Sequence, residues 1–140
     1  MWLTVTSHVT GRPSAFAARI SSIPAAEDEK LLPFAEATPG ATGLELLLSL
    51  TVKWADEAGV PLAKALNRIT VAPAGVLKLD AGRIAVGAHA DLCVFDRNTY
   101  WRVEPRALKS QGHNTPFLGY ELPAQVRATI VSGHVAFEQR

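Results

Sequence analysis

The chain has 140 residues, which is enough for one domain with a core of its own. Its 14 basic and 13 acidic residues are scattered and give a net charge of +1, so the sequence predicts no surface for nucleic acid or an anionic membrane. A single cysteine, Cys93, excludes an internal disulfide, and no apolar run reaches the roughly 20 residues that span a bilayer. We therefore expect a cytoplasmic protein in which Cys93 is buried and inert.

The N-terminal stretch, residues 1–26, contains no acidic side chain and shows no helical or strand periodicity. It is rich in Ser, Thr and Ala and loosely resembles an organellar transit peptide, but an unstructured leader is the simpler interpretation. We expect this stretch to be poorly ordered.

Residues 27–80 are predicted to form a loop followed by helices. Apolar residues at helical spacing predict the first helix over residues 44–58, and Gly59 is expected to end it. Thr42 and Glu45 have the spacing of a capping box at the start of this helix.

Two shorter helices are predicted next. One covers residues 62–69 after Pro61, and the other begins at Pro73 and continues to Leu77. Helices joined by such short loops are typical of an outer layer that packs on a sheet or a barrel.

Residues 81–140 are predicted to be rich in β-structure. Gly87 suits a positive φ, and Asp91 can bond to nearby amides where a buried strand begins. Ser132-Gly133 is a two-residue hairpin signal. A long loop is expected over residues 105–123. The predicted strands cover residues 91–95, 99–103, 126–131 and 134–137.

Three segments carry a resemblance to a known family. They are GRIAVGAHADLCVFD at residues 82–96, LKSQGHNTPFLG at residues 108–119 and LPFAEATPGATGLE at residues 32–45. Together they resemble the C-terminal portion of a dihydroorotase, a member of the amidohydrolase superfamily. The resemblance implies an α/β fold: the last helices of a (β/α)8 barrel, joined to strands of a small flanking β-domain. A complete barrel needs about 250 residues, so only part of one is expected here.

The resemblance also says where substrate and metal would lie. In active family members zinc polarises a cyclic amide, and Phe34 and Ala35 match backbone positions that border the substrate. The family's catalytic Asp-His-Ala-Pro-His motif reads Ser21-Ser22-Ile23-Pro24-Ala25 here, so a carboxylate and an imidazole are replaced by Ser21 and Ala25. Serine is neither a strong base nor a usual zinc ligand. We therefore predict no catalytic residue, no metal ligand and no cofactor in this chain.

Other ionisable residues do not change this prediction. The histidines are far apart, at positions 8, 89, 113 and 134, and show no metal-ligand spacing. Glu27, Asp28 and Glu29 are adjacent to one another and are expected to be solvated.

The sequence of residues 28–36 resembles most closely that of the zinc-site-deficient dihydroorotase-like proteins that associate with aspartate carbamoyltransferase. A non-catalytic scaffold is therefore our first hypothesis. The alternatives are a fragment of an active zinc-dependent dihydroorotase that needs the missing barrel, and an inert truncated product. Without a barrel, the apolar helix faces over residues 44–58 and 62–69 are expected to be exposed and to cause oligomerisation.

Overall fold

The computed structural model describes residues 41–110 and 112–139, which form two compact units. The first unit contains Leu48–Trp101 and residues 122–139, and the second contains residues 41–47, 102–110 and 112–121. The predictions for residues 1–26 and for the loop before residue 41 lie outside the described residues. The elements are η2 (Leu44–Leu46), α2 (Leu47–Glu57), α3 (Leu62–Asn67), α4 (Val71–Val76), β1 (Leu92–Asp96), β2 (Trp101–Arg102), η3 (Pro105–Ala107), β3 (Glu121–Leu122), β4 (Gln125–Val131) and β5 (His134–Glu138).

The helices form where apolar spacing predicts them, with two corrections at their ends. The first turn, η2, is a 3₁₀ turn, and Gly59 follows α2 with a φ of 63°, as expected for a helix stop. The third helix begins at Val71 and not at Pro73. Proline is tolerated there because amides in the first helical turn have no partner within the helix. None of the helices in the described part of the chain has the length and apolar character needed to cross a membrane.

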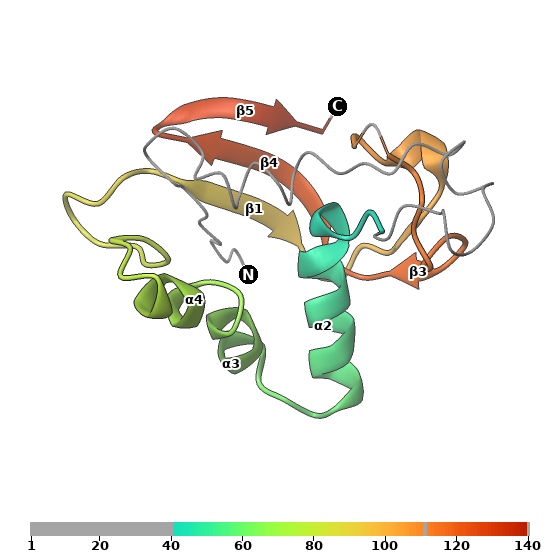
Figure 1. Ribbon diagram of the computed structural model, residues 1–140, viewed down its shortest axis with the longest axis horizontal. Helices are drawn as coiled ribbons and strands as arrows, with labels where there is room; N and C mark the ends of the chain where they lie inside the picture. The colour runs from blue at the N-terminus through green and yellow to red at the C-terminus, as the bar shows by residue number, and fades with distance from the viewer. Residues whose placement is uncertain (1–40, 111, 140) are drawn as a thin grey trace, which may run out of the picture. The chain divides into compact units, whose positions relative to one another are not determined.

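A three-stranded antiparallel sheet forms the β-part of the first unit, with β4 between β1 and β5 (Figure 1). Ser132 and Gly133 have φ values of 49° and 82°, so the predicted two-residue hairpin between β4 and β5 is confirmed. The Asp91 carboxylate accepts a 2.6 Å hydrogen bond from the Ser132 amide. Asp91 thus bonds to an amide at the start of β1, as predicted, but that amide belongs to the turn between β4 and β5, 41 positions away, and not to the neighbouring sequence.

A second, two-stranded sheet is formed by β2 and β3. The predicted strand over residues 99–103 is shorter than expected, and β3 lies within the stretch predicted to be loop, residues 105–123. A strand of two residues is too short to show alternation, which explains why the sequence pattern missed β3.

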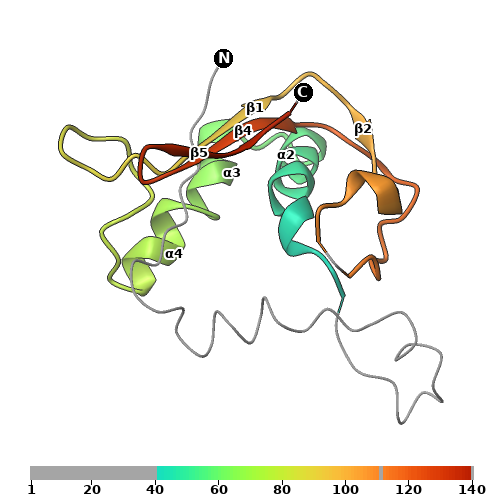
Figure 2. The same cartoon turned by 90° about the horizontal axis from the view of Figure 1, so that it is seen from above.

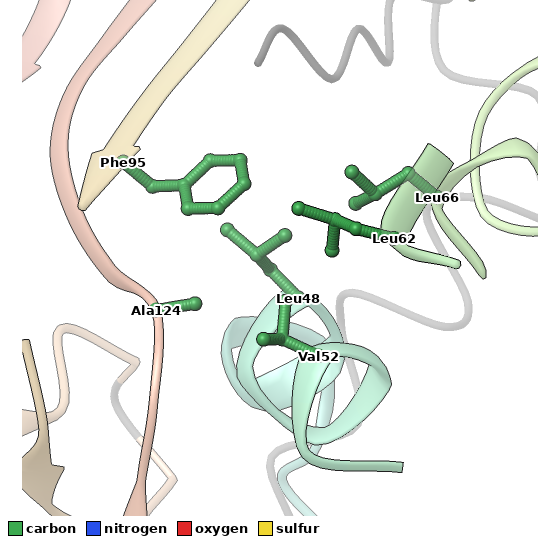
Figure 3. Packing of buried hydrophobic residues seen from close by; sticks show 6 residues of the cluster. All are labelled: Leu48, Val52, Leu62, Leu66, Phe95 and Ala124. Carbon is green, nitrogen blue, oxygen red and sulfur yellow. The ribbon is translucent and has the colours of Figure 1, made fainter. Parts of the chain in front are cut away.

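The helices α2, α3 and α4 lie on the β1 side of the three-stranded sheet in Figure 1, and Figure 2 shows them below its strands when the sheet is seen along its edge. Phe95 points from β1 toward Leu48 of α2 and toward Leu62 and Leu66 of α3 (Figure 3). The core cluster also includes Val52 and Ala124, and none of its six residues is more than 9% exposed.

This core corrects the prediction that the helix faces are exposed. Leu48 and Leu62 are buried because α2 and α3 pack on β1 of the same chain, whereas Leu44 and Leu47, at the start of the first helix, are exposed. Trp54, on α2, is half-exposed.

Candidate functional site

Two of the three family-like segments meet in the second unit, and Glu45 holds them together. One oxygen of its carboxylate accepts a 2.7 Å bond from the Lys109 amide, and the other accepts bonds from the Ser110 amide at 3.0 Å and the Ser110 hydroxyl at 2.8 Å. Amides in an irregular loop need such partners because they have no ladder or helix to satisfy them. Glu45 therefore fixes the backbone at Lys109 and Ser110.

Thr42 makes a second connection between the same segments. Its amide donates to the Asn114 carbonyl at 2.6 Å, and its hydroxyl donates to the Gly112 carbonyl at 2.8 Å. The predicted capping box of Thr42 and Glu45 is therefore wrong, since Gly43 is the N-cap and no side chain caps the turn. Both polar side chains bond to the loop and not to the helix start.

The rest of the loop is held by its own contacts. The Phe117 amide donates to the Thr115 hydroxyl at 3.4 Å, and the rings of Phe117 and Tyr120 meet edge to face with centroids 5.8 Å apart. Val103 is fully buried, accepting from the Gly119 amide and donating to the Tyr120 carbonyl. These contacts give Thr115 and Phe117 a structural role in the loop.

Glu45 and the two residues that it holds, Lys109 and Ser110, are called the clamp below. Both Glu45 oxygens accept hydrogen bonds from the loop, so the described contacts give this side chain a holding role.

The residues predicted to border substrate, Phe34 and Ala35, lie outside the described residues, as do Ser21 and Ala25. The structure therefore leaves their predicted roles as predictions.

Three histidines, His89, His113 and His134, fall within the described part of the chain. Across residues 41–110 and 112–139, no three His, Cys, Asp or Glu side chains come together as a metal site would require. The described residues consequently do not fit a zinc ion. Burial raises the pKa of the Cys93 thiol, which disfavours the reactive thiolate.

One polar cluster was missed from the sequence. Asp96, at the end of β1, accepts from the Thr99 hydroxyl at 2.7 Å, the Asn98 amide at 3.0 Å and Arg127 at 3.4 Å. The Thr99 bond, followed by the Asn98 bond, lowers the pKa of the Asp96 carboxyl. The spacing of Asp96 and Thr99 is a turn signal that could have predicted the local bonds, but not the distant partner Arg127.

A second missed contact lies inside the first unit. Ser49, buried in α2, donates to the Ala124 carbonyl at 3.1 Å and accepts from the Trp101 indole N–H at 3.1 Å. Ala124 has a φ of 66°, unusual for a residue with a side chain, and this bond helps to hold it there. These contacts are structural, since every polar atom named is satisfied within the chain.

The sequence of this chain is similar to a known family and to several of its members. Residues 31–137 match the model of the amidohydrolase family. A dihydroorotase-like protein of Pseudomonas aeruginosa is 41% identical over 111 residues, which are 79% of this chain and 26% of that protein. A dihydroorotase of Citrifermentans bemidjiense is 36% identical over the same length and the same shares.

Solved structures give the same fold. A D-hydantoinase superposes with a TM-score of 0.72 at 22% identity, over 81% of this chain and 25% of the other. A D-hydantoinase (dihydropyrimidinase) from a Thermus species also has a TM-score of 0.72, at 23% identity. The chain spans about a quarter of the length of these relatives.

Proposed function

Because the chain belongs to the amidohydrolase family, we propose that it is a dihydroorotase-like protein of de novo pyrimidine biosynthesis, without catalysis of its own, that acts as a partner or scaffold for aspartate carbamoyltransferase. The observation that carries this proposal is its 41% identity to a protein described as dihydroorotase-like. By resemblance to the family's catalytic motif, Ser21 and Ala25 would also stand where an active member has a carboxylate and an imidazole.

The proposal extends to the fold and the location of the protein. The helices α2, α3 and α4 would correspond to the last helices of a (β/α)8 barrel, and β1, β4 and β5 to strands of the small flanking β-domain. A cytoplasmic location agrees with the lone Cys93.

A second candidate function is supported by the 36% identity to a dihydroorotase of Citrifermentans bemidjiense. In this alternative the chain is part of an active zinc-dependent enzyme, and the metal ligands are supplied by residues beyond those described. Phe34 and Ala35 would then border the substrate. Within the described residues, the clamp at Glu45 would hold the loop of residues 109–114, and no step of the reaction is assigned to it.

The first test is association with aspartate carbamoyltransferase. The purified 140-residue chain is mixed with aspartate carbamoyltransferase of the same organism and analysed by size-exclusion chromatography with light scattering. The proposal expects one co-eluting species whose mass exceeds that of either protein alone. Separate elution at micromolar concentrations of both proteins contradicts it, and would leave an inert truncated product as the better description.

Zinc content and dihydroorotate hydrolysis, measured on the same purified sample, test the alternative. The scaffold proposal expects neither stoichiometric zinc nor turnover. Stoichiometric zinc together with turnover would contradict it and support the enzyme, because zinc hydrolysis needs both the metal and a proton acceptor beside it.

A further inference from the structure

We draw no further inference here: the strongest candidate, the surface patch of exposed aliphatic side chains at Val76, Leu77, Ile84 and Val86, at the end of α4 and in the loop before β1, has nothing in the structure to show what covers it.

Discussion

Two regions of the first unit are both rich in aliphatic residues but differ in how far these side chains are buried. On α2 and α3, side chains such as Val52 and Leu66 are at most 2% exposed, because Phe95 of β1 gives them a surface to pack on. In the segment of residues 77–86, Leu77 is 66% exposed and Ile84 is 73% exposed. Aliphatic content alone therefore does not decide burial, which also requires an opposing surface of the right shape.

The backbone explains the difference. The helices α2 and α3 repeat their side chains along one stripe, so several of them face the sheet at once. Between α4 and β1 the described chain has no helix or strand, and Lys78, Gly82 and Gly87 all have positive φ. An irregular backbone cannot present its apolar residues on a single face, and the aliphatic side chains of this segment consequently point into solvent.

The strongest test of this comparison replaces one large side chain in each region. Phe95→Ala is expected to lower the free energy of unfolding by about 3–5 kcal/mol, because it leaves a cavity between β1, α2 and α3. Ile84→Ala removes an exposed side chain and is expected to change stability by no more than about 0.5 kcal/mol. Urea denaturation of both variants measures the difference. Equal losses would show that Phe95 is not the centre of the core.

The helical periodicity was enough to predict α2 and α3, and the hairpin at Ser132-Gly133 was predicted correctly from two residues. The sequence could not show what the helices pack on. From the sequence, the apolar faces at Leu48 and Leu62 were expected to need a barrel to pack on. In the structure they pack on Phe95, which lies 33 positions after Leu62 in the sequence. A contact of this separation depends on the tertiary fold and leaves no local pattern.

Glycine substitutions test whether the irregular segment has a defined backbone. A Cβ at Gly82 would lie 3.0 Å from the backbone carbon and oxygen of Thr70, whereas a Cβ at Gly87 meets nothing within 4 Å. Both glycines have φ near 80°, so each alanine is expected to cost about 1–2 kcal/mol for its left-handed conformation. Gly82→Ala should add roughly another 1–3 kcal/mol, because backbone atoms must move. Similar unfolding midpoints for Gly82→Ala and Gly87→Ala would mean that this segment does not hold the conformation described.

Hydrogen bonds join distant segments of the second unit, and Glu45 is the residue to test there. Glu45→Gln keeps one acceptor but loses the charge shared by the Lys109 and Ser110 amides. We expect local opening to become easier by about 1–2 kcal/mol, equivalent to roughly 5–30-fold faster hydrogen exchange at these two amides. Glu121→Gln, at an exposed position in the same unit, is the matched control and should leave both exchange rates unchanged. Unchanged exchange in Glu45→Gln would show that Glu45 does not hold this loop.

The candidate site was only partly accessible from the sequence. The segments around Glu45 and Ser110 were recognisable as motifs. The capping box predicted for Glu45 involved only its neighbours in the sequence, but its hydrogen-bond partners in the structure lie more than 60 residues away. Helix-start spacing describes local bonds, and a carboxylate at such a position also bonds to distant loop amides when the fold brings them close. The absence of a catalytic carboxylate and imidazole, in contrast, was predicted from residue type at Ser21 and Ala25, and it stays a prediction because both positions lie outside the described residues.

The smallest effect on stability, and the clearest effect on association, is expected in the aliphatic segment itself. Ile84→Asp combined with Val86→Asp should change the free energy of unfolding by no more than about 0.5 kcal/mol, because both side chains are exposed. Exposed aliphatic groups favour self-association, so the unmodified chain is expected to form oligomers whose mass rises with concentration, and the double variant to remain monomeric. Sedimentation velocity over a concentration series measures this, with Val135→Asp, at an exposed position on β5, as the control that should still associate. If the unmodified chain is monomeric throughout the series, exposure of the segment has no consequence for assembly, and the difference between the two regions is one of packing alone.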